Sequence, residues 1–156
     1  MKYRYLLIDN DNTLMDFHAA EHAALRETLT EAGIEPTDAV CARYSAINDA
    51  LWKALERGET THAALKITRF AQLLAEYPAK NVCAHRLALR YSHYLGTHAD
   101  LMPGAEAFLR RLHGQMKIVL VSNGDSVIQR NRLFRCVFTP LLDNIVISSE
   151  KGVSKP

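Results

Sequence analysis

The chain has 156 residues, 48% of them apolar and 23% charged, and its formal net charge is +2 when the seven histidines are neutral. This length suits one domain or a core with a small insertion, and the apolar content argues against a disordered chain. The balanced charge gives no reason to expect a nucleic acid or a membrane surface as partner, and no apolar run is long enough to cross a bilayer. The N-terminus lacks the pattern of a signal peptide and the three cysteines show no paired spacing, so we expect ordinary thiols in a reducing cytoplasm.

Three apolar, β-rich runs predict strands. They cover residues 3–8, 117–121 and 144–148. We expect the first strand to be buried, and the turn-forming residues after it predict a loop at 9–16.

The segment between the first two strands is expected to be almost wholly helical. Threonine, glycine and proline mark the expected helix ends. The expected helices cover 17–32, closed by Gly33; Thr37 to about 57, closed by Gly58; Thr60 or Thr61 to just before Pro78; and about 80–95, closed by Gly96. Two further helices are expected at 105–113 and 125–135, and the second is rich in arginine.

Strands that alternate with helices indicate an α/β fold with a parallel sheet. We predict a Rossmann-like core built from residues 1–16 and 98–156, with an all-helical cap at residues 17–97 inserted after the first strand. An insertion at the carboxyl end of a strand lies over the place where open α/β sheets bind their ligands.

Two acids, Asp9 and Asp11, follow the first strand directly and are separated by one residue. One carboxylate can act as a nucleophile and form an aspartyl-phosphate, while its neighbour gives and takes protons. Two acids on one loop can also hold Mg²⁺, which prefers oxygen ligands. Taken alone, the pattern fits a solvated turn equally well, because Asp and Asn favour turns.

Polar groups follow the other two strands as well. Ser122 and the backbone N–H groups near Asn123 can bind a phosphate oxygen, and Gly124 allows close approach at the start of the next helix. After the third strand, Lys155 can neutralise the nucleophile and a phosphate, and Lys151 competes for that role. Read singly, these residues fit turn punctuation and a solvated lysine.

The acids, the hydroxyl and the lysine occur in that order, one group after each predicted strand. This arrangement resembles the haloacid dehalogenase-like hydrolases over the whole chain. Their first motif, DxDxT, is matched by Asp9, Asp11 and Thr13. Their second motif, a Ser or Thr that ends a strand, is matched by Ser122, and their third, often a Lys-Pro pair, by Lys155. The helical segment is similar to a cap inserted after the first motif.

Within this superfamily, several stretches resemble the bacterial pyrimidine 5′-nucleotidases. These stretches are YSAINDALWKALERGETT, KITRF, LMPGAEAFL and VISSEKGVSKP. The resemblance implies a phosphatase that removes the 5′-phosphate of pyrimidine nucleoside monophosphates such as UMP and dTMP.

The resemblance also implies a role for each motif residue. Asp9 would be the nucleophile and Asp11 the general acid and base. Mg²⁺ would be held by the Asp9 carboxylate and the Asp11 backbone carbonyl. Ser122, Asn123 and Lys155 would hold the transferring phosphoryl group.

Other residues would support the loop or read the nucleoside. Thr13 would support the loop that carries the acids. Asn48, Trp52 and Arg69 in the cap are candidates for nucleoside contacts. The alternative for Trp52 is packing on a helix face, and the alternative for Arg69 is a surface ion pair.

One family feature is not found in the sequence. The fourth motif, an acidic pair after a fourth strand, completes the Mg²⁺ site, and Asp125 and Asp143 do not match its position. We therefore expect a core whose C-terminal strands are missing, with weak Mg²⁺ binding and poor turnover. In the family the fourth strand lies beside the first, so the first strand is expected to form an uncovered apolar edge through which the chain could associate with itself.

A rival interpretation comes from HAAEH, residues 18–22, which matches the inverted zinc-peptidase motif H-x-x-E-H. The spacing puts His18 and His22 on one helical face. A catalytic zinc needs a third protein ligand that the sequence does not single out, so we favour a solvated helix face. Zinc content, and its loss in His18→Ala, separates the two interpretations.

Two further alternatives stay open at the level of sequence. The chain could bind a phosphorylated ligand without hydrolysing it, since the fourth motif is not found. It could also act on another small phosphate ester, such as a sugar phosphate or phosphoglycolate, because the motifs for the chemistry do not read the leaving group.

Overall fold

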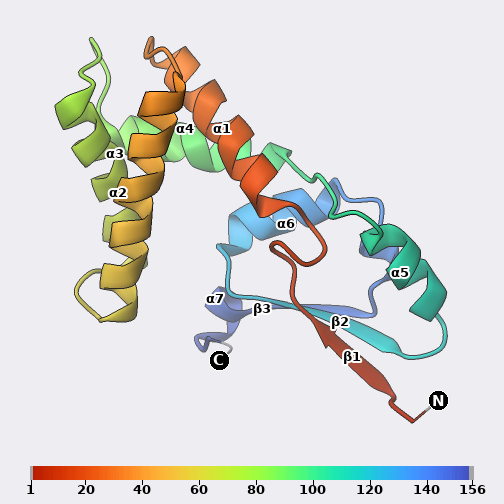
Figure 1. The fold of residues 1–156 in the computed structure, drawn as a ribbon. Helices are drawn as coiled ribbons and strands as arrows, with labels where there is room; N and C mark the ends of the chain where they lie inside the picture. Colours follow the sequence, from red (N-terminus) through yellow and green to blue (C-terminus); the bar gives the residue numbers. More distant parts are fainter. Residues whose placement is uncertain (1, 155–156) are drawn as a thin grey trace. The chain divides into compact units, whose positions relative to one another are not determined.

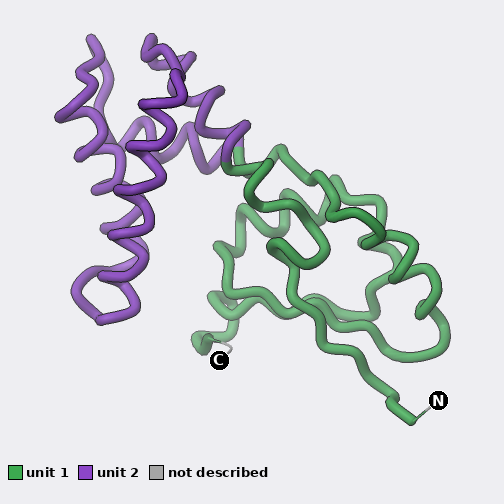
Figure 2. The backbone as a smooth tube through the Cα atoms, viewed as in Figure 1, with its two compact units in different colours: residues 1–21, 95–156 green, residues 22–94 purple. Residues whose placement is uncertain are grey.

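The structure is a computed structural model that describes residues 2–154 (Figure 1). The chain divides into two compact units (Figure 2). Residues 1–21 and 95–156 form one unit, called the sheet unit here, and residues 22–94 form the helical unit. That the helical unit acts as a cap stays a prediction.

In the sheet unit, strands and short helices follow one another along the chain. They are β1 (Tyr5–Ile8), α5 (Ala105–Leu112), β2 (Lys117–Ser122), α6 (Ser126–Phe134), the 3-10 helix η1 (Thr139–Leu141), β3 (Asn144–Ile147) and α7 (Ser148–Lys151). Residues 17–97 are almost wholly helical, as expected, with no strand among them. The helices of this segment are α1 (Phe17–Glu31), α2 (Asp38–Glu56), α3 (His62–Glu76) and α4 (Ala84–Thr97). None of the described helices is long and apolar enough to span a membrane.

The three strands form one parallel sheet in the order β1-β2-β3. Leu6 of β1 pairs with Ile118 of β2, and Leu120 of β2 pairs with Ile145 of β3. This topology confirms the predicted α/β fold. Because all three strands run the same way, the residues that follow them gather at one edge of the sheet.

Strand β1 lies at the side of this sheet and is only half covered, so the expectation of a buried strand was wrong. Leu6 and Ile8 pack against the core, whereas Tyr5 is 66% exposed and Leu7 70% exposed. The side chains alternate because successive residues of a strand point to opposite faces. Among the described residues β1 pairs with β2 alone, and self-association through its other edge stays a prediction.

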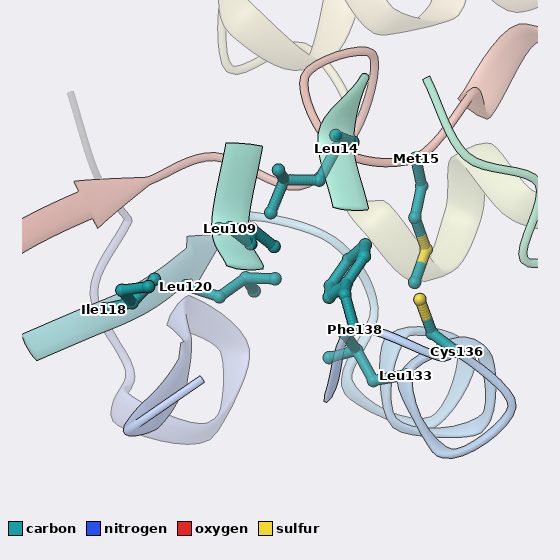
Figure 3. Packing of buried hydrophobic residues seen from close by; sticks show 9 residues of the cluster. Leu14, Met15, Leu109, Ile118, Leu120, Leu133, Cys136 and Phe138 are labelled. Atoms are coloured by element: carbon teal, nitrogen blue, oxygen red, sulfur yellow. The ribbon is translucent and has the colours of Figure 1, made fainter. Parts of the chain in front are cut away.

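The core of the sheet unit is formed by β2 together with the loop after β1, α5, α6 and the chain after α6. Figure 3 shows side chains from the first loop, α5, β2, α6 and the chain after α6 meeting in one cluster. Its buried members are Leu14, Met15, Ala105, Leu109, Ile118, Leu120, Leu133, Cys136 and Phe138. Leu14 and Met15 anchor the loop after β1 in this cluster, so the acids that precede them are attached to a packed core.

Helix starts agree with the sequence where a threonine cap was expected. The Thr37 hydroxyl accepts a hydrogen bond from the Val40 N–H, and the Thr61 hydroxyl accepts one from the Ala64 N–H. The last helix of the helical segment begins four residues later than predicted, and Gly96 does not end it. A Cβ at Gly96 would lie 3.4 Å from the Cβ of Asn131, so this glycine allows a close approach to α6 instead.

The helical unit is organised around an aromatic cluster. Tyr44, Phe70 and Tyr91 are buried, and the centroids of their rings lie 5.4 to 5.9 Å apart. These separations are typical of stabilising aromatic pairs. All three cysteines are free, and burial raises the pKa of the Cys41 and Cys136 thiols.

Candidate active site

The loop after β1 is folded tightly around Asn10, the residue between the two acids. The Asn10 carbonyl oxygen accepts hydrogen bonds from the N–H groups of Thr13, Leu14 and Met15, at 3.2, 2.8 and 3.0 Å. Its side chain is fully buried and donates to the Gln129 Oε1 at 3.4 Å. Asn10 therefore fixes the backbone that carries Asp9 and Asp11.

Asn12 fixes the second half of the loop. It has a φ of 58°, which asparagine tolerates better than most residues, and its Oδ1 accepts from the N–H groups of Phe17 and His18. These bonds satisfy the exposed N–H groups at the start of α1. The Thr13 side chain, predicted to support the loop, is exposed, and the support comes from Asn10 and Asn12.

Asp11 is held by two residues of α6. The Arg132 Nη1 donates to one carboxylate oxygen at 2.5 Å, and the Gln129 Nε2 donates to the other at 2.7 Å. The Arg132 side chain is 1% exposed and the Asp11 side chain 29% exposed. Two hydrogen-bond donors of α6 therefore fix the Asp11 carboxylate, and the Asp11 side chain is still partly exposed to solvent.

Ser122 ends β2 and is buried. Its Oγ accepts hydrogen bonds from the Gln129 Nε2 at 2.8 Å and from the Gly124 N–H at 3.1 Å. One amide nitrogen thus binds both Asp11 and Ser122. The structure brings the first and second motifs together at the carboxyl ends of β1 and β2, as the sequence predicted. Asp9 is half-buried at the end of β1, and Asn123 is exposed.

The three cap candidates lie in different surroundings. Asn48 and Arg69 are both 7% exposed, and the Arg69 Nη1 donates to the Asn48 Oδ1 at 3.2 Å. The surface ion pair considered for Arg69 was wrong, because its guanidinium is packed against aromatic rings. Trp52 is 42% exposed and packs edge-on against His62, with ring centroids 5.6 Å apart. Lys155 lies outside the described residues.

The acids near the later strands are engaged in structural contacts. Asp125 caps α6 by accepting from the Ile128 N–H. Asp143 binds the Lys117 ammonium and the Ile118 N–H, and these bonds lower the pKa of its carboxyl group.

Glu150 on α7 is engaged in the same way. Hydrogen bonds from Arg130 and then Ser126 lower its pKa to about 2. Like Asp125 and Asp143, it is committed to another partner in the sheet unit.

Oxygen atoms of the first loop are the atoms at this site that could hold a metal ion. Asp9 and Asp11 offer carboxylate and backbone oxygens, the ligand type that Mg²⁺ prefers, and Mg²⁺ commonly binds one or two carboxylates and keeps several waters. Among residues 2–154 no group of three or more His, Cys, Asp or Glu side chains could hold a metal ion. His18 and His22 of the zinc interpretation are both exposed.

Sequence reasoning missed the two α6 residues and the asparagines of the loop. Gln129 and Arg132 are three positions apart, so they share one face of a helix. That spacing was visible, but it looked like any arginine-rich amphipathic helix. Nothing in it names Asp11, more than a hundred residues away, as their partner.

Comparisons with known proteins place this geometry in a family. The family model for haloacid dehalogenase-like hydrolases matches residues 3–156. The chain therefore belongs to the haloacid dehalogenase-like hydrolases.

Individual relatives agree with this assignment. The chain is 36% identical over 155 residues to the HAD-hydrolase YfnB of Bacillus subtilis, covering 99% of this chain and 66% of that protein. It is 34% identical over 157 residues to the pyrimidine 5′-nucleotidase PynA of Streptococcus pneumoniae, covering 100% and 66%. It is 29% identical over 156 residues to the pyrimidine 5′-nucleotidase YjjG of Escherichia coli, covering 100% and 67%.

A solved structure of Bacillus subtilis YfnB, bound to magnesium, is also similar. The TM-score is 0.92 at 35% identity, covering 100% of this chain and 68% of that one. The chain spans about two thirds of the length of the curated relatives that it matches.

Proposed function

We propose that this protein is a Mg²⁺-dependent phosphatase that removes the 5′-phosphate of pyrimidine nucleoside monophosphates. The observation that carries the proposal is the amide nitrogen of Gln129, which binds both Asp11 and Ser122. It means that the side chains assigned to proton transfer and to phosphate binding lie within reach of one small ligand. The identity to PynA supports the nucleotide as substrate.

The reaction has two steps, in which Asp9 and Asp11 act in turn. An Asp9 oxygen attacks phosphorus, and the bond from phosphorus to the ester oxygen breaks as Asp11, which enters this step as the protonated acid, gives that oxygen its proton and becomes a carboxylate. Water then attacks the aspartyl-phosphate while Asp11 takes a proton from it. The bond from phosphorus to Asp9 breaks, inorganic phosphate leaves, and both carboxyl groups return to their starting state.

The phosphoryl group needs positioning and charge neutralisation more than covalent chemistry. The Ser122 hydroxyl would donate a hydrogen bond to a phosphoryl oxygen, and backbone N–H groups near Asn123 and Gly124 would do the same. Lys155 would add a positive charge. The Asp9 carboxylate and the Asp11 carbonyl would hold Mg²⁺, which would neutralise charge on the phosphoryl oxygens.

The nucleoside would be read by the helical unit. Asn48 and Arg69 are bonded to each other in its interior, whereas Trp52 has an exposed ring. The exposed ring of Trp52 suits stacking against a base. Another small phosphate ester remains the alternative substrate, because Asp9, Asp11 and Ser122 would act on the phosphoryl group and the ester oxygen alone, whatever group that oxygen carries.

The test is phosphate release by the full-length protein with Mg²⁺. UMP and dTMP are compared with a sugar phosphate and phosphoglycolate. We expect the pyrimidine nucleotides to have the largest kcat/KM. Asp9→Asn should lower the rate at least about 10³-fold, because it removes the nucleophile.

Asp100→Asn is the matched control, since it makes the same change of charge at an exposed residue of the sheet unit. We expect it to keep the activity. Faster release from a sugar phosphate would overturn the choice of substrate. An active Asp9→Asn variant would overturn the nucleophile, and no release from any ester would overturn the phosphatase itself.

A further inference from the structure

The side-chain amide of Gln129 makes hydrogen bonds on both of its ends. Its Nε2 donates to an Asp11 carboxylate oxygen and to the Ser122 Oγ. Its Oε1 accepts from the Arg132 Nη1 at 3.0 Å and from the Asn10 Nδ2 at 3.4 Å. The Asp11 carboxylate can only accept and the Arg132 guanidinium can only donate, so only the orientation with Nε2 toward Asp11 and Oε1 toward Arg132 satisfies both partners.

This orientation decides where the Ser122 hydroxyl proton points. A hydroxyl group has one proton and two lone pairs. The Ser122 Oγ accepts from both the Gln129 amide and the Gly124 N–H. With both lone pairs used, the proton is directed away from these donors and is free to bind a phosphoryl oxygen.

Arg132 donates to the Asp11 carboxylate oxygen that Gln129 does not bind, and Arg132 is itself held by further contacts. Its Nε donates to the His98 carbonyl oxygen at 2.9 Å, and its guanidinium lies 5.6 Å from the ring centroid of Phe17. Its Nη2 is buried and has no hydrogen-bond partner among the described residues. A buried guanidinium with these contacts has little freedom, so the carboxylate that it binds has little freedom either.

Gly124 makes room for this arrangement. A Cβ at this position would lie 2.7 Å from the Gln129 Nε2 and 2.8 Å from its Cγ. Real side chains do not approach so closely, and Gln129 cannot move aside without losing its four bonds. The glycine after the second motif therefore serves the buried amide as well as any close approach of a phosphate.

We propose that Gln129 and Arg132 are positioning residues that align the Asp11 carboxylate and the Ser122 hydroxyl proton for phosphoryl transfer. This inference rests on the proposed roles of Asp11 and Ser122. Neither α6 residue needs to touch the substrate. Gln129 acts on both groups through one nitrogen, whereas Arg132 acts on Asp11 and on the amide of Gln129.

The test uses Gln129→Met in the full-length protein, because methionine keeps the length of the side chain and removes both donors. Two esters are compared with Mg²⁺ present: UMP, whose alkoxide leaving group needs a proton, and p-nitrophenyl phosphate, whose leaving group does not. We expect kcat/KM to fall about 10-fold for the aryl ester, through Ser122. For UMP it should fall about 100-fold or more, because the proton donor is misaligned as well.

Arg130→Ala is the control, since Arg130 lies on the same helix in an exposed ion pair with Glu150. It should leave kcat/KM unchanged for both esters. Equal losses for the two esters in Gln129→Met would mean a merely structural role and would overturn the inference. A wild type active on UMP and an equally active Gln129→Met would overturn this inference and leave the proposed function standing. A wild type inactive on every ester would overturn both.

A second measurement does not depend on activity. In the wild type, the side-chain N–H₂ protons of Gln129 should exchange slowly with water by NMR, since both are buried and bonded. In Asp11→Ala, one of the two resonances should shift as its acceptor is lost. Rapid exchange in the wild type would overturn the inference.

Discussion

Both units of the molecule bury an arginine, and the two guanidinium groups are held in different ways. Arg132 in the sheet unit binds the Asp11 carboxylate, the Gln129 amide and a backbone carbonyl. Arg69 in the helical unit donates to the neutral Asn48, and its Nε has no hydrogen-bond partner among the described residues. It lies instead over aromatic rings, 4.6 Å from the centroid of Tyr91, 5.5 Å from Phe70 and 5.9 Å from Tyr44.

The two buried guanidinium groups differ in how directional their contacts are. A guanidinium bonded to a carboxylate and a carbonyl is fixed in distance and angle, and it fixes its partners in return. A guanidinium over rings is attracted to their faces with little angular demand, for about 2 kcal/mol when desolvated. The proposed chemistry depends on the orientation of Asp11, and the directional bonds are found in the sheet unit.

The largest effect on stability is expected from Arg132→Met. The substitution removes one of the two donors to the Gln129 Oε1, the hydrogen bond from Arg132 to the His98 carbonyl oxygen, and the ion-pair partner of Asp11. Breaking a buried ion pair from one side costs about 3 kcal/mol. Urea unfolding followed by far-ultraviolet circular dichroism measures the loss.

A double-mutant cycle supplies the control for this prediction. In Asp11→Asn/Arg132→Met the cost should be smaller than the sum of the two single costs, because the residues are in direct contact. Additive costs would show that the two side chains do not interact, and the contrast between the buried arginines would then fail.

A smaller effect is expected from Arg69→Met. Methionine also packs well against rings. Arg69 has no carboxylate partner among the described residues, so removing its charge removes a desolvation penalty, which offsets the loss of its hydrogen bond to Asn48. We expect the free energy of unfolding to change by less than about 1 kcal/mol in either direction. Trp52 is the chain's only tryptophan and lies in the helical unit, so its fluorescence follows this unit during urea unfolding. A loss as large as that of Arg132→Met would contradict the comparison.

The smallest effect concerns an exposed arginine, Arg130, which pairs with Glu150. Glu150 has a folded-state pKa of about 2, below its ordinary value of 4.5, chiefly through hydrogen bonds from Arg130 and Ser126. A lowered pKa means that the pair contributes stability above about pH 4.5 and loses it as the pH falls toward 2. The contribution is small because the pair is exposed to solvent.

Carboxyl NMR titration checks this pair directly. The Glu150 midpoint should lie near pH 2 in the wild type and move up toward 4.5 in Arg130→Ala. An unchanged midpoint would mean that Arg130 does not lower the pKa. Lys117→Ala serves as a control, because it removes a different exposed ion pair of the sheet unit.

Much of the site could be predicted from the sequence because it depends on local chemistry. An apolar strand that ends in Asp9 and Asp11, and another that ends in Ser122, give the positions of the motifs without knowledge of the fold. Threonine caps at Thr37 and Thr61 were visible for the same reason, since a cap bonds to a residue only three positions away.

What the sequence did not reveal depends on contacts between distant segments. Gln129 and Arg132 contact Asp11 only because α6 packs against the loop after β1. Gly96 looked like a helix end because its sequence neighbours do not include Asn131. The coverage of β1 depends on which segments pack on each face of the sheet, and its alternating exposure shows that one of its two faces is left open.

By itself, then, the sequence determined the family, the parallel α/β core and the residues that stand at the ends of its first two strands, because these follow from patterns along the chain. Only the tertiary structure decided that a buried amide and guanidinium of α6 orient Asp11 and Ser122, and that Arg69 is packed among rings instead of paired at the surface. The physical reason is the same in each case. A hydrogen bond or a stacking contact needs two partners. The sequence shows each residue, but it does not show which distant residue folding brings into contact with it.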